Sequence, residues 1–517
     1  MMTKSKTMDA GIALVIAFVP VALVLLATAS GPGTSPDSIS YSTGALSLSQ
    51  GMGLRDFSGD YLATFPPGLS IALAALLTVG LPTDVAVTSL NVVMLIATVV
   101  LGYATARIVL PSRFMAVVIL VVFAWNRSTV EVFSMLWSEP MFTALTMASM
   151  LIVVCAFNKR SISTWTSVTL GLIIAAAVSI RYSGALLAIG LVLASMTIAA
   201  PSMRVRALRL AFIAGPGLVV LAVIVLNNIR NGHGYFGDRY PSSRGLQGTV
   251  VSATDALGSL VLWRGSTSLT VLIGTIVVVF AVVGAWFGLM KRLPTTPLSL
   301  LVLTYATGLI ISQSATRLDD ASERLAYPIY LPLLILVAVG AQAMTLTVSS
   351  NLRSRLPLLH PVVIRGAVFG SLAIVVTGVI IVGVTNSLRF SINANQFGIG
   401  YRASSVQDSP AAKLLRTIPA ADAVISNEPW LVASLRPGAL SLPLPPRPSE
   451  WPEERLMRDK DRIKDVVSAD KPAWILIFDE GLPYEDPIGI SGFESLSSVN
   501  PIFEDVDAVT LYRVVPE

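Results

Sequence analysis

The sequence has few of the residues from which soluble proteins build disulfides, metal sites and charged surfaces. It contains one cysteine, Cys155, and two histidines, His233 and His360. An internal disulfide, a cysteine–histidine zinc site and a histidine-rich metal site are therefore excluded. Charged residues are only 13% of the 517 residues, about half the share of a typical soluble domain. The net charge of +5 does not by itself indicate nucleic-acid binding in so apolar a chain.

The charges that are present divide the chain into two parts. Residues 401–517 hold 19 of the 31 acidic residues but only 12 of the 36 basic ones, so residues 1–400 are basic. Hydrophobic residues make up 54% of the sequence, and their long runs all lie before residue 400. We therefore predict a transmembrane domain over 1–400 and a polar, acidic domain over 401–517.

The apolar runs predict an α-helical polytopic membrane protein, because about 17–25 apolar residues cross a bilayer as a helix. Eleven spans are expected, at 10–30, 84–105, 113–129, 140–157, 164–180, 184–200, 208–228, 268–290, 297–314, 327–348 and 365–387. The apolar stretch 66–81 is short and opens with two prolines, so we interpret it as an interfacial helix; the alternative is a twelfth span. The first span resembles a signal peptide, but its length favours an uncleaved helix.

The basic residues between spans set the orientation by the positive-inside rule. With a cytoplasmic N-terminus and eleven spans, 14 lysines and arginines before the first span and at later span ends face the cytoplasm, and Asp9 is the only acidic residue beside them. A twelfth span would reverse the later loops and destroy this pattern. We therefore expect a multi-pass protein of the plasma (inner) membrane whose acidic tail is extracytoplasmic.

The first outer loop, residues 31–83, carries the strongest candidate for catalysis. Asp37 can start a short helix in which Tyr41, Ala45 and Leu48 share one face, and Gly51 can end it in a left-handed conformation. A carboxylate near the interface can act as a general base on a hydroxyl nucleophile, especially where partial burial raises its pKa. The alternative is that Asp37 only caps the helix.

This pattern, with Pro66-Pro67 opening an apolar stretch after it, resembles the first extracytoplasmic loop of the GT-C glycosyltransferase superfamily. The resemblance implies a multi-spanning enzyme that uses polyprenyl-phosphate-linked sugars, similar to protein O-mannosyltransferases and to aminoarabinose and arabinofuranosyl transferases. It implies that Asp37 is the catalytic residue and that the proline-rich segment forms juxtamembrane helices. Many members have a second acidic residue beside the catalytic one, whereas here the neighbour is Ser38. Asp56 or Asp60 could assist instead, and no metal ion or other cofactor is expected.

Other polar clusters at predicted outer helix ends also resemble those of bacterial GT-C-like proteins. They are Trp137-Ser138-Glu139-Pro140, Arg181-Tyr182, and Asp319, Asp320, Glu323, Arg324 and Tyr327. We assign Arg181, Arg324, Tyr182 and Tyr327 to the donor phosphate, for which a planar guanidinium is well suited. The alternatives are interfacial snorkelling of Arg181 and a ligand-free loop ion pair of Glu323 with Arg324.

Four further residues are assigned to substrate contacts: Tyr41, Asp60, Glu139 and Arg239. Arg239 lies in the segment Gly237-Asp238-Arg239-Tyr240-Pro241, in the long loop 230–266. For Glu139 we favour the alternative that it is the structural partner of a nearby arginine rather than a second catalytic acid.

The tail alternates helical and strand signals, which predicts a small α/β domain. Helices are expected at 410–418 and 453–467, strands at 422–426, 473–478 and 508–515, and a proline-rich loop at 441–452. The tail has no glycine-rich phosphate loop and no nucleophile elbow. We interpret it as a non-catalytic domain that braces or covers the outer face; the alternative is acceptor recognition.

Together these features predict a membrane glycosyltransferase of the cell envelope. A sugar would pass with inversion from a polyprenyl-phosphate donor to a hydroxyl of a glycan, lipid or protein acceptor on the outer face. One alternative is a transporter or flippase, which predicts charged residues or broken helices at mid-membrane. Others are a non-catalytic assembly protein built on the same fold and a lipid-linked glycan polymerase or ligase.

Overall fold

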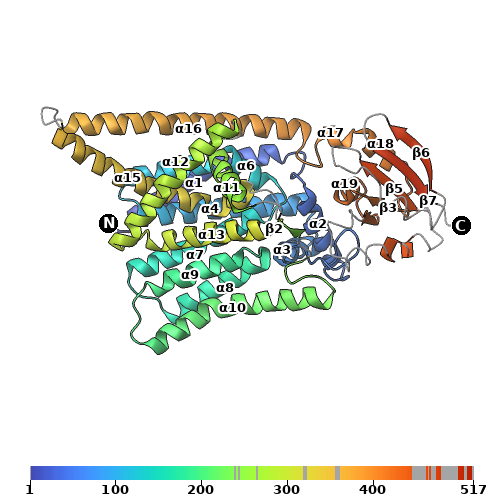
Figure 1. Cartoon of the computed structure of the whole chain (residues 1–517), viewed down its shortest axis with the longest axis horizontal. Coiled ribbons are helices and arrows are strands. Elements are labelled where there is room, and N and C mark those ends of the chain that lie inside the picture. The colour runs from blue at the N-terminus through green and yellow to red at the C-terminus, as the bar shows by residue number, and fades with distance from the viewer. Residues whose placement is uncertain are drawn as a thin grey trace. The chain divides into compact units, whose positions relative to one another are not determined.

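The structure is a computed structural model, and its chain divides into two compact units (Figure 1). It describes residues 2–237, 240–242, 245–262, 266–317, 323–355, 361–444, 461–463, 465–466, 473–478, 499–505 and 509–514. Unit 1 comprises Met1–Ala29, Ala63–Leu69 and Val87–Asn395, and unit 2 comprises Ser30–Leu62, Ser70–Ala86 and Gln396–Glu517. Unit 2 thus begins its last segment near the predicted boundary at 401, and it also includes most of the first loop.

Unit 1 is a bundle of helices. They are α1 (Met2–Ala27), α4 (Thr83–Val109), α5 (Arg113–Ala124), α6 (Arg127–Ser134), α7 (Glu139–Asn158), α8 (Thr164–Ile180), α9 (Gly184–Met196), α10 (Met203–Arg230), α11 (Leu246–Leu262), α12 (Thr267–Lys291), α13 (Thr296–Ala315), α14 (Glu323–Ala326), the 3-10 helix η1 (Tyr327–Ile329), α15 (Tyr330–Arg355) and α16 (Pro361–Phe397). Two short strands, β1 (Tyr240–Pro241) and β2 (Thr316–Arg317), pair antiparallel.

Every predicted span coincides with a helix. Within the described part of the chain, eight helices are long and apolar enough to cross a membrane, or nine if α5 and α6, which meet at a 54° bend, form one span. The other two predicted spans are α8 and α9, which are apolar but shorter. The chain is therefore a multi-pass α-helical membrane protein.

Helix α11 is a difference from the prediction, which treated 230–266 as a loop. It packs tightly on α12: Gly258 lies against the backbone of Thr270, and Gly274 against that of Thr254, with no room for a side chain. Small residues let two helix backbones approach closely within a membrane. The small and polar residues that made this segment look like a loop are thus its packing surface.

Helix α3 (Gly68–Thr78) shows whether the apolar stretch 66–81 is long enough to be a twelfth span. Its 11 residues extend about 16 Å at 1.5 Å per residue, roughly half the thickness of a hydrocarbon core. This length supports an interfacial helix rather than a twelfth span.

Unit 2 contains a mixed five-stranded sheet in the order β4-β3-β5-β7-β6. Its elements are α2 (Pro36–Ser49), α17 (Ser404–Gln407), α18 (Pro410–Leu415), β3 (Ala423–Ser426), α19 (Pro429–Leu435), β4 (Ser441–Pro443), β5 (Ala473–Phe478), β6 (Val499–Asp505) and β7 (Val509–Val514). Strand β3 is parallel to β4 and β5, and β7 is antiparallel to β5 and β6. One apolar core, which includes Val424 and Leu476, and a second, which includes Ile425 and Ile475, come from alternate residues of β3 and β5.

The predicted α/β character of the tail is confirmed. The predicted helix at 410–418 and the strands at 422–426, 473–478 and 508–515 correspond to α18, β3, β5 and β7. The predicted loop 441–452 is wrong at its start, where 441–443 form the edge strand β4 beside β3. Of the predicted helix 453–467, residues 461–463 and 465–466 are helical, and the remainder lies outside the described residues.

Candidate functional site

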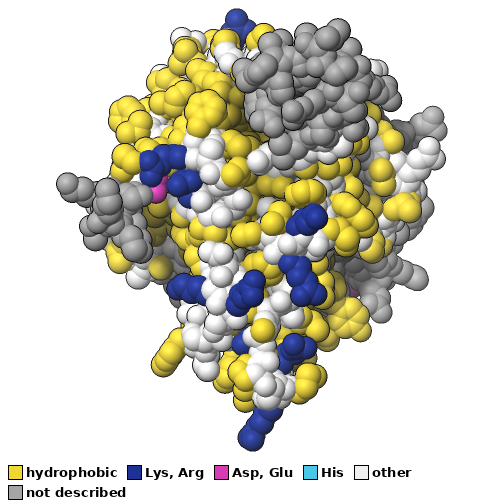
Figure 2. Space-filling model, turned by 90° about the vertical axis from the view of Figure 1, so that its left-hand side faces the viewer, with side chains coloured by type: hydrophobic (Ala, Val, Ile, Leu, Met, Phe, Trp, Pro, Cys, Tyr) yellow, Lys and Arg dark blue, Asp and Glu magenta, His cyan; other side chains and the backbone are white. Residues whose placement is uncertain are grey.

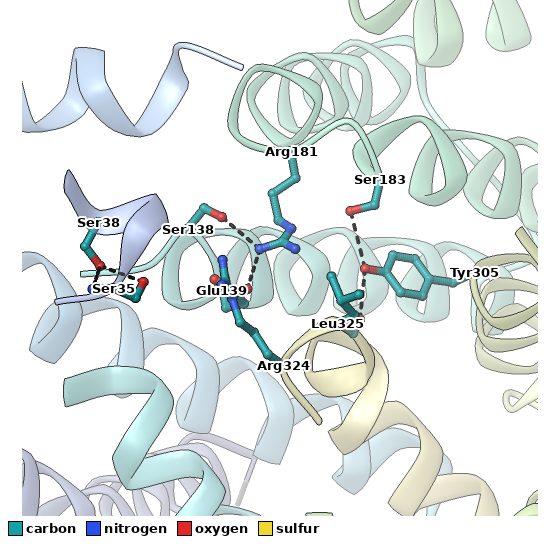
Figure 3. Close-up of polar contacts among 9 residues, drawn as sticks. All are labelled: Ser35, Ser38, Ser138, Glu139, Arg181, Ser183, Tyr305, Arg324 and Leu325. Atoms are coloured by element: carbon teal, nitrogen blue, oxygen red, sulfur yellow. Dashed lines mark hydrogen bonds and ion pairs between the residues drawn. The ribbon is translucent and has the colours of Figure 1, made fainter. Parts of the chain in front are cut away.

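Asp37 lies in the first turn of α2, in unit 2, and is partly buried. The N-cap residue is Ser35, whose backbone N–H donates to the Ser38 hydroxyl at 3.0 Å (Figure 3). Ser35 and Ser38 thus form a capping box, and the alternative that Asp37 is the N-cap is wrong. The helix ends before Gly51, which has the predicted left-handed conformation, with φ at 76°. Because capping is done by the serines, the Asp37 carboxylate is not needed for it.

The tail pairs with the residues of the first loop that come just before α2 and Asp37. The Tyr401 N–H donates to the carbonyl of Thr34 at 3.0 Å, and Thr34 also forms a parallel bridge with Gly400. Burial raises the pKa of the Tyr401 hydroxyl, and the carboxylates of Glu428 and Asp37 raise it further. Glu428 is therefore a second acidic side chain in this neighbourhood. Sequence reasoning missed it, since no local signal links positions so far apart in the chain.

Asp56 and Asp60, which could assist Asp37, share a tight turn of unit 2. The N–H and hydroxyl of Ser58 donate to Asp56 Oδ1 at 2.9 and 2.6 Å, and Arg462 of the tail forms an ion pair with Asp60. Burial raises the pKa of Asp56, although the hydrogen bonds from Ser58 oppose this shift. Asp60 is thus engaged by an arginine of the tail, and its assignment to substrate stays a prediction.

Tyr41 is on the buried face of α2, as its spacing predicted, with 2% of its surface exposed. Its carbonyl accepts a hydrogen bond from the Ser70 hydroxyl at 3.1 Å. Ala45 is also buried. The side chain of Tyr41 is therefore part of the core of unit 2, and its contact with a substrate stays a prediction.

In unit 1, Glu139 brings together two arginines that the sequence assigned to one ligand (Figure 3). Glu139 begins α7 and is completely buried. Arg181, the residue that ends α8, lies 2.5 Å from Glu139 Oε1 and donates to the Ser138 hydroxyl at 2.8 Å. Arg324 in α14 donates through Nε to the same carboxylate oxygen. The interpretation of Glu139 as an arginine's partner is confirmed, for two arginines instead of one.

Both arginines of this cluster are nearly buried. The Arg181 and Arg324 side chains are only 12% and 15% exposed, and the Arg324 guanidinium stacks 4.6 Å from the Trp137 ring centroid. Glu139 Oε2 is buried and has no hydrogen-bond partner among the described residues. Because guanidinium groups bind phosphate through directed, charge-assisted hydrogen bonds, these two arginines are candidates for anion binding.

The two tyrosines assigned to the phosphate have hydroxyls that bind protein groups. Tyr182 donates to the carbonyl of Ala63 and accepts from Asn228, both at 3.1 Å. Tyr327 is fully buried and donates to the Thr129 hydroxyl at 2.9 Å. These bonds fix the segments next to Arg181 and Arg324, and a role of the tyrosines in phosphate binding stays a prediction.

Arg239 and its neighbour Asp238 lie outside the described residues, as do Asp319 and Asp320. Among the residues that are described, no three or more histidines, cysteines or acidic residues form a group able to hold a metal ion. The expectation of metal-independent chemistry stays a prediction.

Comparison with known proteins finds likeness in structure and none in sequence. No protein-family profile matches the chain, and no curated protein matches it. The chain is similar to ArnT from Cupriavidus metallidurans bound to undecaprenyl phosphate, with 11% identity and a TM-score of 0.57 over 99% of this chain and 98% of that one. The apo state of ArnT gives 13% identity and a TM-score of 0.58 over the same shares. The archaeal oligosaccharyltransferase AglB from Archaeoglobus fulgidus has 12% identity and a TM-score of 0.49, over 92% of this chain and 70% of that one.

The likeness to ArnT extends over nearly the whole of both chains, so it includes the helices of unit 1 and the sheet of unit 2. At this low identity it concerns the fold. The chain is thus a multi-pass membrane protein with a fold similar to that of ArnT, and its predicted fold class is confirmed.

Proposed function

We propose that this protein is a GT-C-type glycosyltransferase that moves a sugar from a polyprenyl-phosphate donor to a hydroxyl acceptor on the extracytoplasmic face. The observation that carries the proposal is the pair of nearly buried guanidiniums that meet at one oxygen of Glu139. Two guanidiniums held so close together suit a phosphate group, because guanidinium and phosphate form directed, charge-assisted hydrogen bonds. The similar fold of ArnT was solved with undecaprenyl phosphate, which supports a ligand of this class.

In the proposed reaction Asp37 acts as the general base. It takes the proton of the acceptor hydroxyl while the hydroxyl oxygen attacks the anomeric carbon of the donor sugar. The bond from that carbon to the phosphate oxygen breaks, and polyprenyl phosphate leaves with the electron pair. Attack opposite the leaving group inverts the anomeric configuration. A positioned general base contributes about 10²- to 10⁴-fold to such a rate.

Arg181 and Arg324 would stabilise the leaving phosphate, on which negative charge develops as the bond breaks. Preorganised donors at such a position are among the largest contributions to catalysis. Glu139 would not react. It would hold both guanidiniums in place through its Oε1 atom, so that they need not reorganise when the donor enters.

The test is a transfer assay with the purified protein in lipid nanodiscs. A panel of radiolabelled polyprenyl-phosphate sugars is supplied with candidate acceptors, and the product is identified by mass spectrometry. Asp37→Ala is expected to lower the rate at least 100-fold without changing donor binding. The matched control is Asp408→Asn, at an exposed aspartate of unit 2, which should retain the wild-type rate. Wild-type activity of Asp37→Ala would disprove the catalytic assignment.

Donor binding is tested separately, with unlabelled polyprenyl phosphate as the probe. Arg181→Ala and Arg324→Ala should each weaken binding by about 10- to 100-fold, the loss expected for a charge-assisted hydrogen bond. Because binding is measured without turnover, this experiment separates the phosphate site from the role of Asp37. Unchanged affinity in both variants would show that the phosphate binds elsewhere.

A transporter or flippase is the second candidate, and one observation favours it. Helices α5 and α6 meet at a 54° bend, and a broken helix is a feature of transporters. Next to the break, Arg127 and Glu131 of α6 form an ion pair with a 3.6 Å separation. Proteoliposomes loaded with a lipid-linked sugar separate the candidates: a transporter moves the intact molecule across the bilayer, whereas a transferase cleaves it.

A further inference from the structure

One end of unit 1 is covered with exposed basic side chains. Figure 2 shows this face, where lysines and arginines are spread over an apolar surface and acidic side chains are scarce. Five of the bases, Lys159, Arg160, Arg204, Lys291 and Arg292, are exposed, and Arg206 is partly exposed. Among the described residues, none of these six forms an ion pair with a carboxylate.

Three of the basic segments meet at this end because their helices pack together. Arg209 of α10 is buried and donates to the carbonyls of Ile198 and Ala199, at 3.3 and 3.2 Å, and to that of Ile162 at 3.4 Å. These bonds join the start of α10 to the ends of the α7–α8 and α9–α10 connections. The bases at 159–160 and 204–206 are therefore close neighbours.

The third segment follows α12. Gly190 of α9 packs on Leu301 of α13, and Leu186 packs on Gly308. Residue numbers run in opposite directions along this contact, so the two helices are antiparallel. The end of α9 near residue 196 therefore lies beside the start of α13 at residue 296, and Arg292 comes just before that start.

Two of the arginines adopt a backbone conformation that normally selects glycine. Arg160 and Arg292 have φ angles of 53° and 48°, and they are the only non-glycine residues with positive φ in the described chain. Each closes a Schellman motif, in which the next residue, Ser161 or Leu293, donates back to a carbonyl in the last turn of the helix. Glycine is preferred at this position because a Cβ atom is strained there.

Compared with glycine, arginine at these two positions adds a positive charge at the end of each helix. This charge interacts favourably with the carbonyl groups at the end of its own helix, but that interaction does not explain why four further basic residues lie nearby. The six bases of this end come from three separate segments, 159–163, 197–206 and 291–296, which contain no acidic residue. The positive charge of these six bases would be compensated by anionic groups outside the protein, such as the headgroups of lipids at the membrane surface.

We propose that this end of unit 1, defined by Lys159, Arg160, Arg204, Arg206, Lys291 and Arg292, is a docking surface for the phosphate headgroups of anionic phospholipids. Arg160 and Arg292 are its specific contacts, held at the helix ends by the two Schellman motifs. Each basic side chain near a membrane surface adds about fivefold to anionic-lipid affinity. The surface consists of residues of unit 1 alone, and the inference is independent of the proposed reaction.

The test compares the wild type with the double variant Arg160→Gly/Arg292→Gly in nanodiscs. One set contains phosphatidylcholine alone, and the other an equimolar mixture with phosphatidylglycerol. The mixture should raise the wild-type unfolding midpoint by several degrees and that of the variant by less than half as much. Retention of phosphatidylglycerol measured by native mass spectrometry should be about 25-fold weaker in the variant, at about fivefold for each of the two lost charges.

Folding failure cannot imitate this result, because glycine suits the left-handed position and the variant should be at least as stable as the wild type in pure phosphatidylcholine. Two controls sharpen it. Arg160→Lys/Arg292→Lys should keep most of the lipid effect, and Arg55→Ala/Arg416→Ala, which removes two exposed charges of unit 2, should keep all of it. An equal phosphatidylglycerol effect in wild type and glycine variant would overturn the proposal, as would an equally large shift caused by free inorganic phosphate.

Discussion

The two units of the molecule use charged residues in opposite ways. In unit 1 the Glu139 cluster is buried: the carboxylate is wholly inaccessible, and its two arginines are 12% and 15% exposed. In unit 2 the pairs are partly open to solvent. Arg402 contacts Asp84 through two bonds of 2.7 and 2.6 Å, with side chains 33% and 46% exposed, and Arg462 with Asp60 is similar.

The difference matters because burial decides what a charge pair contributes. Breaking a buried pair leaves an uncompensated charge in a low-dielectric interior, whereas water and salt screen an exposed pair. The buried cluster is therefore critical for stability and is a candidate for ligand binding. The exposed pairs of unit 2 link the first loop to the tail but contribute little to the free energy of folding. Four changes test this contrast.

Glu139→Gln should have the largest effect on stability. It removes the negative charge that Arg181 and Arg324 share, and breaking a buried ion pair costs about 3–5 kcal/mol in comparable sites. The unfolding midpoint in detergent should fall sharply, and added polyprenyl phosphate should restore part of it by replacing the lost negative charge. A midpoint close to that of the wild type would mean that the arginines have another anion as their partner.

Arg324→Lys keeps the charge and loses the planar guanidinium. The stack on Trp137 disappears, and stability should fall by about 1 kcal/mol, far less than in Glu139→Gln. Chemical denaturation of the purified variant measures this difference. A loss as large as that of Glu139→Gln would show that geometry, and not charge, controls the cluster.

Arg402→Ala tests the exposed pair with Asp84. The expected loss is about 0.5–1 kcal/mol, the range for solvent-exposed ion pairs, and it should shrink as salt is raised. A double-mutant cycle with Asp84→Asn isolates the interaction, and Arg416→Ala serves as an exposed arginine of the same unit that hydrogen-bonds to Gln407. A coupling energy near that of the buried cluster would remove the contrast between the units.

Asp56→Asn should have the smallest effect, and that effect should depend on pH. Burial raises the pKa of Asp56 above its ordinary value of 3.8, so folding favours the protonated form. Its contribution to stability is fully present below the unfolded pKa and is lost as pH rises through the folded pKa. Hydrogen exchange over residues 54–62 should therefore show the variant better protected than the wild type at neutral pH and equal to it in acid. The reverse order would mean that the Asp56 pKa is lowered on folding.

The sequence predicted the helical bundle well because a membrane-spanning helix requires a continuous run of apolar residues, which is visible in the sequence. It failed at α11, where Gly258, Thr254 and their neighbours interrupt the run. Those small residues pack against α12, so the information lies in a pairing of two helices and not in the hydropathy of one. In the tail, β4 and α19 were missed because each is short and contains or follows a proline.

The candidate site was predictable by residue type and not by partner. Glu139, Arg181 and Arg324 were each singled out at helix ends, and Glu139 was expected to pair with an arginine. That both arginines reach one oxygen of Glu139 follows only from the packing of α7, α8 and α14. Likewise, the capping of α2 by Ser35 and Ser38 depends on backbone angles, and the nearness of Glu428 to Asp37 depends on the fold of the tail.

The bridge between Thr34 and Gly400 has a consequence for biosynthesis. Unit 2 joins Ser30–Leu62 and Ser70–Ala86 to Gln396–Glu517, and about 300 residues separate these parts. At the usual rates of translation, roughly 15–60 s pass between the appearance of the first loop and that of its partner segment. The loop with Asp37 therefore lacks its partner segment while the helices of unit 1 are being synthesised. A nascent chain arrested just before Gly400 would contain every helix of unit 1 but only the first part of unit 2.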